Sequence, residues 1–186
     1  MPGTLILYAT TEGQTARIAE RIARALRNRG HAAETCPATD APQGLGAAGY
    51  NGVVVGASIH YGRHPAYLRS LVRSHRAALE ARPSAFFSVS LSGGGPGAKP
   101  EAARRYLEVF LRQTGWHPQQ TATFAGALPY SRYGAFKRRL MVAFVGLGGG
   151  DTDTSRDYEY TDWDAVERFA ETFAQRLGPA TSPGPT

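Results

Sequence analysis

The chain has 186 residues, of which 42% are hydrophobic, and this length favours a single domain with one sizeable core. Its single cysteine, Cys36, excludes an internal disulfide and a multi-cysteine metal site, and it fits a reducing compartment such as the cytoplasm. The formal net charge of +6 favours an anionic partner, but not nucleic acid, because no zinc-finger or RRM-like signature accompanies the arginines.

The predicted elements begin with a strand, a turn and a helix within residues 4–26. Residues 5–8 are apolar, and a helix with apolar residues at helical spacing follows the hydroxyl-rich turn Thr10–Thr15. The first N–H groups of a helix have no intrahelical partner and lie at the positive end of its dipole, so an anion can bind there. The threonine hydroxyls and Gly13 suit a phosphate monoester. An ordinary turn in which threonine caps the helix is the alternative.

Strands and helices alternate along most of the remaining chain. The apolar run 52–57 shows no alternation, which predicts a strand buried on both faces. The other predicted strands are 31–36, 85–91 and 121–128, and the predicted helices are 66–81, 100–113 and 162–177. This pattern indicates one domain over residues 1–177 with an open parallel α/β sheet. We expect a loop or short helix over 37–49, a last helix capped by Thr161 or Asp162, and a disordered tail over 178–186.

An insertion of about residues 129–160 separates the fifth predicted strand from the last helix. It places the cationic residues Arg132, Lys137, Arg138 and Arg139 before an apolar run, residues 140–147. This combination describes either an interfacial helix or a surface helix packed on the sheet. The run is too short to span a membrane, which takes about 20 residues, and the opening residues do not form a secretory signal.

Three loops follow predicted strands at the edge of the sheet where ligands bind in this architecture, namely 10–15, 58–62 and 88–97. The first lacks the GxGxxG and GxxxxGK[ST] patterns of dinucleotide and nucleoside triphosphate sites, so a single phosphate fits it best. Tyr61 in the second loop can stack on a flat heterocycle, and the small residues of the third let backbone N–H groups approach its edge. Phosphate, stacked ring and hydrogen-bonded edge together describe flavin mononucleotide, FMN.

Two other patterns are incomplete. Gly56-Ala57-Ser58-Ile59-His60 begins like a hydrolase nucleophile elbow but has His60 where the second glycine belongs, so we expect no hydrolase, and we interpret His60 and His64 as polar groups of the loop. Asp151 and Asp153 lack the other ligands of a calcium loop, so we expect no metal.

Residues 6–22 resemble the flavodoxin signature that binds the FMN phosphate. Beyond them, the stretches 53–62, 83–91, 124–133 and 149–163 resemble a narrower family, the menaquinone-dependent protoporphyrinogen IX dehydrogenases. The resemblance implies a flavodoxin-like, doubly wound sheet of five parallel strands in the order 2-1-3-4-5, with the insertion after the fifth. The glycine-rich loop 92–98 departs from the more polar, basic loop that we expect in this family.

The resemblance also implies where the cofactor binds. The phosphate would lie on the first loop, the ring along the stretch from Phe86 to Leu91, and the insertion would close over it near Gly150 and Asp151. Thr15 joins the set on physical grounds, and Ser58 and Tyr61 come from the second loop. The candidate cofactor-binding residues are Thr10, Thr11, Glu12, Gly13, Gln14, Thr15, Ser58, Tyr61, Phe86, Ser88, Val89, Ser90, Leu91, Gly150 and Asp151.

The family's role implies FMN-dependent oxidation of protoporphyrinogen IX in heme biosynthesis, with menaquinone or ubiquinone as acceptor and attachment to the inner face of the cell membrane. Arg132, Lys137, Arg138 and Arg139 would then meet the substrate's propionates or an anionic membrane surface. A flavodoxin-like electron carrier and an NAD(P)H:quinone reductase stay open as alternatives. Residues 1–150 carry 18 Lys and Arg against 7 Asp and Glu, which disfavours the usually acidic carriers. The catalytic residue and the oligomeric state are not defined by the sequence.

Overall fold

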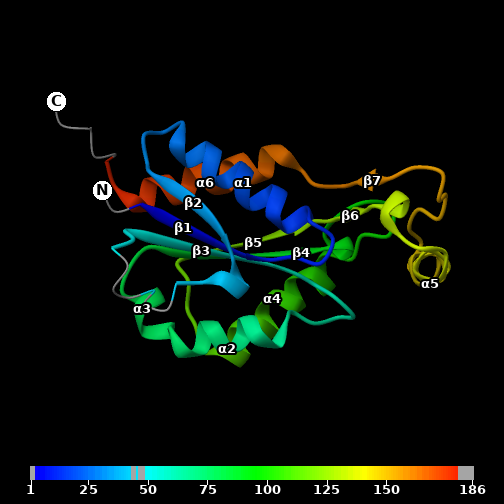
Figure 1. Cartoon of the computed structure of the whole chain (residues 1–186), viewed down its shortest axis with the longest axis horizontal. Helices are drawn as coiled ribbons and strands as arrows, with labels where there is room; N and C mark the ends of the chain where they lie inside the picture. Colours follow the sequence, from blue (N-terminus) through cyan, green and yellow to red (C-terminus); the bar gives the residue numbers. More distant parts are fainter. Residues whose placement is uncertain (1–2, 43–44, 46–48, 180–186) are drawn as a thin grey trace.

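The computed structural model describes residues 3–42, 45 and 49–179, and it places a parallel sheet between two layers of helices (Figure 1). The strand order is β2-β1-β3-β4-β5, which confirms the predicted doubly wound sheet. All neighbours in this sheet pair in parallel, as Leu5 with Val53 and Val54 with Ala85. The strands are β1 (Thr4–Ala9), β2 (Ala33–Pro37), β3 (Gly52–Ser58), β4 (Ser84–Ser90) and β5 (Gln120–Ala125).

Each face of the sheet carries its own hydrophobic core, because successive side chains of a strand point to opposite faces. Ile6 and Phe87 lie in the core under α1 (Gln14–Arg27) and α6 (Trp163–Leu177). Leu5 and Phe86 lie in the core on the other face. The helices there are α2 (Ala66–Ser74), α3 (Arg76–Glu80) and α4 (Pro100–Thr114) (Figure 1). This burial of both faces explains the apolar run of β3.

The predicted helix 66–81 is wrong as a single element, since the chain breaks between α2 and α3 at His75. The backbone of His75 has φ −109° and ψ 12°, outside the helical region, and its Nδ1 lies 3.0 Å from the Leu71 carbonyl oxygen. The last helix begins as predicted, because the Asp162 carboxylate accepts a hydrogen bond of 2.9 Å from the Ala165 N–H.

The predicted fifth strand is also interrupted. β5 ends at Ala125, and after Gly126 the chain forms β6 (Ala127–Leu128), which pairs antiparallel with β7 (Tyr158–Glu159). Between them lies α5 (Ala135–Leu147), beyond the end of the sheet (Figure 1). Its inner side packs on a third small core, formed by Leu128, Tyr130, Tyr133 and Val145, rather than on the sheet.

The chain also contains short 3₁₀ turns, η1 (Ala38–Asp40), η2 (Leu91–Gly93) and η3 (Tyr130–Arg132). The first falls in the predicted loop 37–49, of which 43–44 and 46–48 lie outside the described residues, as does the predicted tail from residue 180 on. Within the part of the chain that is described, no helix has both the length and the apolar character needed to cross a membrane.

Candidate functional site

The loop between β1 and α1 leaves the first turn of α1 open to an anion. Gly13 precedes the helix with φ 92°, a left-handed conformation that favours glycine. Thr10 Oγ1 accepts a hydrogen bond of 2.9 Å from the Gly13 N–H, within the loop. No side chain caps α1, so threonine does not act as its cap here, and the positive end of the helix dipole faces the loop.

Within the described parts of the chain, the hydroxyl of Thr15 has no hydrogen-bond partner although its side chain is buried. Thr15 is 1% exposed, and it lies in the first turn of α1. A buried polar group without a partner costs about 1–3 kcal/mol, so native proteins rarely keep one without a reason. A phosphate at the helix N-terminus would give this hydroxyl an acceptor, and the residues present therefore fit a phosphate group.

The other predicted residues of this loop have different surroundings. Thr10 and Thr11 are exposed. The amide of Gln14 donates to Thr161 Oγ1 at 2.8 Å, so its side chain ties α1 to the chain before α6. Glu12 forms an ion pair with Lys137, with a distance of 2.6 Å between Oε1 and Nζ. Gln14 can therefore offer a ligand its backbone N–H but not its side chain.

Two cationic residues of the insertion lie beside this loop. Lys137 reaches Glu12, and its Nζ lies 4.5 Å from the ring centroid of Tyr133. The Arg132 guanidinium lies 3.7 Å from the position that a Cβ on Gly13 would take. The other two predicted cations do not lie at this loop. Arg138 donates to the Tyr133 carbonyl oxygen, and Arg139 is exposed. Arg132 adds positive charge where an anion would bind.

The second predicted loop presents an aromatic ring on a tight turn. The backbones of His60 and Arg63 exchange hydrogen bonds of 2.9 and 3.1 Å, which leaves Tyr61 and Gly62 at the tip with φ of 48° and 74°. Tyr61 is 80% exposed and is the one non-glycine residue with positive φ in the described chain. A left-handed tyrosine costs about 1–2 kcal/mol, and such strain is typical of ligand sites.

The prediction for β4 is wrong for the side chain of Phe86. This ring is fully buried and stacks on Phe110 with 4.5 Å between centroids. Ser88 and Val89 are buried as well, and Ser88 Oγ lies 3.0 Å from His64 Nε2. Because a central parallel strand is covered on both faces, its side chains reach a ligand only where the strand ends.

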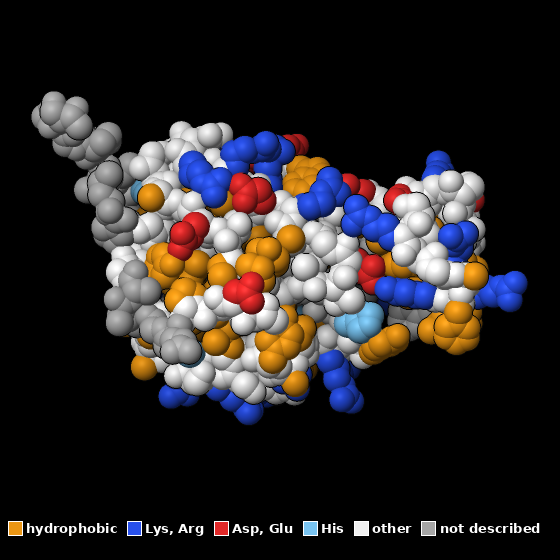
Figure 2. Space-filling view, viewed as in Figure 1, with side chains coloured by type: hydrophobic (Ala, Val, Ile, Leu, Met, Phe, Trp, Pro, Cys, Tyr) orange, Lys and Arg blue, Asp and Glu red, His pale blue; other side chains and the backbone are white. Residues whose placement is uncertain are grey.

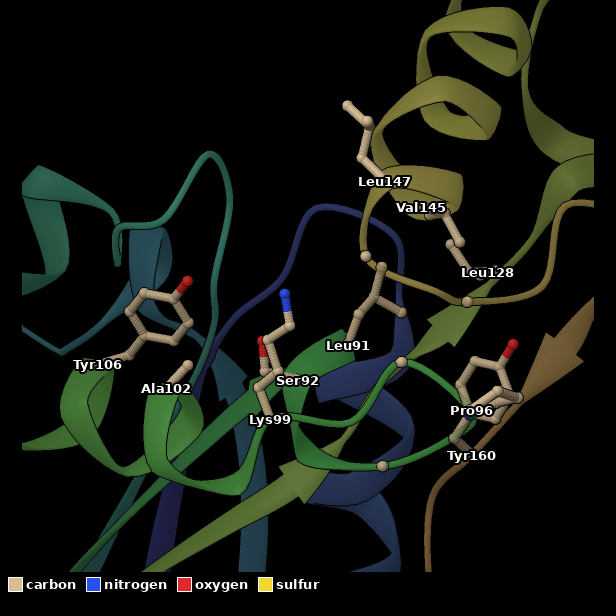
Figure 3. Close-up of a pocket in the computed structure, with 14 residues that line it drawn as sticks. Leu91, Ser92, Pro96, Lys99, Ala102, Tyr106, Leu128, Val145, Leu147 and Tyr160 are labelled. Atoms are coloured by element: carbon tan, nitrogen blue, oxygen red, sulfur yellow. The ribbon is translucent and has the colours of Figure 1, made fainter.

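The end of β4 does open onto a cavity. Leu91 lines a cavity of about 310 Å³ between the glycine-rich loop, the start of α4 and the end of α5 (Figure 3). Ser90, just before it, is buried and its hydroxyl has no partner. The residues that line the cavity are Leu91, Ser92, Gly94, Pro96, Gly97, Lys99, Ala102, Tyr106, Leu128, Val145, Leu147, Gly148, Gly150 and Tyr160.

Several of these residues were missed by sequence reasoning. Lys99, Ala102 and Tyr106 lie at helical spacing at the start of α4, and that spacing, next to the third loop, could have identified them. Leu147 and Tyr160 come from the insertion, whose path no local pattern predicts. The cavity is thus built from residues 91–106 together with Leu128, residues 145–150 and Tyr160, which are distant from one another in sequence.

The glycines of the third loop allow the insertion to pack against it. A Cβ on Gly97 would lie 2.9 Å from the Gly148 carbonyl oxygen, and one on Gly94 would lie 2.7 Å from the Ala125 Cβ. These approaches are closer than a side chain permits. The loop therefore departs from the expected polar composition because it forms a packed joint with its neighbours.

Gly150, one of the predicted closing residues, lines the cavity, whereas Asp151 is not among the lining residues. The Asp151 carboxylate accepts a hydrogen bond of 2.5 Å from the Tyr160 hydroxyl, and its carbonyl oxygen accepts one of 2.7 Å from Tyr130. Burial and the bond to Asp151 raise the pKa of Tyr160. Asp151 therefore holds the tyrosines that shape the insertion.

His64 lies behind the second loop and is neutral at physiological pH. It is 6% exposed, and burial, assisted by the nearby Arg69, lowers its pKa from 6.5 to about 4. The interpretation of His64 as a loop residue thus becomes more specific, because its ring is a buried partner of Ser88. His60 is exposed, with its ring 4.2 Å from that of Tyr61.

A parallel sheet in the order 2-1-3-4-5, with an uncapped helix N-terminus after β1 and a cavity at the carboxyl end of β4, defines a doubly wound protein of the flavodoxin-like class. The sequence matches the flavodoxin domain family over residues 5–155. Two solved flavodoxins share the fold. One is a short-chain flavodoxin associated with a non-canonical PDU bacterial microcompartment (TM-score 0.57, 12% identity, 96% of this chain and 100% of that chain). The other is a mutant flavodoxin from Pseudomonas aeruginosa (TM-score 0.56, 15% identity, 94% and 98%).

Curated relatives narrow the class. The protoporphyrinogen IX dehydrogenase (quinone) of Leishmania major is 41% identical over 175 residues, which cover 93% of this chain and 75% of the relative. The enzyme of the same name from Escherichia coli K12 is 36% identical over 173 residues, which cover 92% and 94%. The chain belongs to this family, the quinone-linked protoporphyrinogen IX dehydrogenases, and membership in the flavodoxin class implies a flavin cofactor.

Proposed function

We propose that the protein oxidises protoporphyrinogen IX to protoporphyrin IX, with FMN as its flavin and menaquinone or ubiquinone as electron acceptor, as a step of heme biosynthesis. The observation that carries the proposal is the open first turn of α1 with the unpartnered Thr15 hydroxyl, in a chain of this family. In each step of this oxidation the macrocycle loses two electrons and two protons, and these convert one quinone to its quinol.

FMN is the flavin that the first loop fits best. The loop offers one phosphate-sized site and lacks the glycine fingerprint that holds a pyrophosphate. The backbone N–H groups of α1, the Thr15 hydroxyl and the Arg132 guanidinium would hold the phosphate. Tyr61 would cover the ring from the second loop, and the backbone around Leu91 would meet its edge.

FMN, when bound, supplies the redox chemistry by taking up electrons from the substrate and passing them to the quinone. The chain supplies binding, orientation and exclusion of water. Leu91, Leu147 and Tyr160 give the cavity an apolar wall suited to a macrocycle, and Lys99 places one positive charge at it. His64 is not placed to take a proton from the substrate, because its ring is buried beside Ser88 and burial lowers its pKa to about 4, which makes it a weak base.

We further propose that α5 binds an anionic membrane surface on the cytoplasmic face of the cell membrane. Phe136 (82% exposed), Leu140 (49%) and Leu147 (91%) lie along one side of the helix, opposite the buried Val145, and Arg139 flanks them. Figure 2 shows Lys and Arg gathered with hydrophobic side chains over the end of the molecule that carries α5. Apolar residues beside cations suit the interface of an anionic membrane, in which a lipid-soluble quinone also resides.

An anaerobic assay tests the reaction. The FMN-loaded protein is mixed with protoporphyrinogen IX and a menaquinone analogue, and porphyrin fluorescence is followed. We expect a rise that requires both FMN and quinone. A quinone-independent rise, or none, contradicts the proposal, and quinone reduction by NAD(P)H in place of the porphyrinogen would favour the reductase alternative.

Co-sedimentation with vesicles containing anionic lipid tests the membrane contact. Reversing the charges of Lys137, Arg138 and Arg139 together should abolish binding, but Lys137 also contacts the phosphate loop, so a narrower variant is sharper. We expect Phe136→Ser with Arg139→Glu to abolish co-sedimentation. The control Arg112→Glu, an exposed residue on α4, should retain nearly all of it. Equal binding by the double variant and the control refutes the role of α5.

A further inference from the structure

A second cavity, of about 330 Å³, lies between the loop after β3 and the helices α2 and α4. Three arginines line it, Arg63 from the loop, Arg69 from α2 and Arg105 from α4, and none of its lining residues is acidic. We call this cavity the arginine cleft. Its residues come from segments some forty positions apart, so no motif in the sequence marks it.

In the part of the chain that is described, the charge that lines the cleft is unpaired, whereas part of the charge on α1 is paired. On α1, arginines are paired across to acidic residues, as Arg17 is with Glu159 and Arg21 with Glu167. Arg63 and Arg105 form no ion pair within the described residues, and both are exposed. Like charges gathered around one cavity repel one another, and an anion that enters it relieves the repulsion.

The third arginine is held in place. Arg69 donates a hydrogen bond of 3.1 Å to the His64 carbonyl oxygen, and it remains at the cleft wall. Arg63 and Arg105 are thus the lining arginines whose guanidinium groups make no hydrogen bond or ion pair with the described residues. The planar guanidinium carries a fork of donors that matches a carboxylate.

The arginine cleft adjoins the cavity proposed for the flavin and its substrate. Tyr106 lines both cavities, and Gly62 of the cleft follows Tyr61 at the tip of the aromatic turn. In Figure 3 the ring of Tyr106 lies on α4, near Ala102 and across the cavity from Leu91 and Leu147. A ligand whose ring occupies the apolar cavity can therefore extend a charged arm past Tyr106 into the cleft.

We propose that the arginine cleft binds the carboxylates on the side arms of the tetrapyrrole substrate, through Arg63 and Arg105. The inference rests on the proposed function, since it assigns a subsite to that substrate. It replaces the expectation that Arg132 and Lys137 bind the propionates, because the structure places those two beside the phosphate loop. The macrocycle's apolar body would remain against Leu91 and Leu147.

Comparing the affinities of a diacid and of its diester tests the carboxylate contact separately from the rest of the site. The probes are protoporphyrin IX and its dimethyl ester, titrated into the FMN-loaded protein and followed by porphyrin fluorescence. We expect the wild-type protein to favour the diacid. Arg63→Gln and Arg105→Gln should each raise the Kd of the diacid about tenfold, as for the loss of one charge-assisted hydrogen bond, and leave that of the ester unchanged.

The matched control is Arg104→Gln, which removes the same charge from the adjacent position of α4, outside the cleft. It should leave both affinities within about twofold of wild type. In turnover, the cleft variants should raise KM for protoporphyrinogen IX more than they lower kcat, because the arms lie away from the reacting ring.

Three outcomes overturn the assignment while leaving the proposed function intact. The first is equal affinity of the wild-type protein for diacid and ester, and the second is an equal effect of Arg104→Gln and Arg105→Gln. The third is a loss of binding to anionic vesicles by the cleft variants with unchanged porphyrin affinity, which favours a lipid contact. A wild-type protein that prefers the diacid but oxidises no porphyrinogen would support the cleft and refute the reaction instead.

Discussion

Replacing Thr15 by valine should weaken FMN binding without weakening the protein itself. The Thr15 hydroxyl is buried in the first turn of α1 and has no hydrogen-bond partner among the described residues. Valine has nearly the same shape and removes only the hydroxyl. The free protein then no longer carries an unsatisfied polar group, so its free energy of unfolding should stay unchanged or rise by up to about 1 kcal/mol.

The loss in affinity follows from the bond that the hydroxyl would make to the phosphate. A hydrogen bond to a charged group contributes about 1.5–3 kcal/mol, and each 1.4 kcal/mol changes an equilibrium constant about tenfold. The Kd for FMN should therefore rise by about 10- to 100-fold. Thr15→Val should thus weaken FMN binding without lowering the free energy of unfolding, whereas loss of a structural contact would lower the free energy of unfolding.

The matched control is Thr114→Val. Thr114 is also buried, but its Oγ1 lies 2.9 Å from the Phe110 carbonyl oxygen, at the other end of the sheet from the phosphate loop. This variant should lose about 1 kcal/mol of stability and keep its affinity for FMN. Urea unfolding of the FMN-free protein gives the stabilities, and quenching of flavin fluorescence gives the Kd. If Thr15→Val binds FMN as tightly as wild type, the phosphate does not lie at this hydroxyl.

Three further predictions concern pH, the glycine-rich loop and the last helix. The pKa of His64 is about 4 in the folded protein and about 6.5 when unfolded, so the unfolded state binds more protons between these values and stability falls as pH is lowered through them. Urea unfolding between pH 8 and 4 should show about 3 kcal/mol of this loss, and His64→Gln should remove that component; an identical pH profile for both would contradict the neutral, buried ring. Gly97→Ala should force the loop off the insertion, cost about 1–3 kcal/mol and raise the Kd for FMN, whereas Gly134→Ala, with open space at its Cβ, should do neither, and equal melting temperatures would refute the packed joint. Asp162→Ala should cost about 1 kcal/mol by removing the cap of α6, and a change below the error of urea unfolding would show that the cap is not needed.

The fold was predictable because its signals are local. The apolar run of β3 and the regular alternation of strands and helices define a parallel sheet without any knowledge of tertiary contacts. The phosphate loop is equally local, since strand, loop and helix are continuous in the chain. The break at His75 was not predictable, because the apolar spacing of α2 and α3 continues across it.

The rest of the site depends on contacts between distant segments. Phe86 was assigned to the ligand because it lies in the right strand, but burial on both faces of a central strand leaves only its end available. The placement of Arg132 at Gly13 follows from the path of the insertion, which leaves the sheet after β6. Such positions are set by packing and not by spacing.

The uneven charge of the sequence acquires a spatial meaning in the fold. Acidic residues of the C-terminal part lie opposite arginines of α1 and of the turn after it, where Arg17 pairs with Glu159, Arg21 with Glu167 and Arg29 with Glu171. This pairing offsets part of the positive charge on the face that carries α1 and α6. Arginines without an ion pair among the described residues line the arginine cleft and lie at the end that carries α5, and Figure 2 shows Lys and Arg along the edge over α2. An anionic substrate would thus be attracted to the side of the molecule where the cleft opens, and an anionic membrane to the end where α5 exposes its apolar residues.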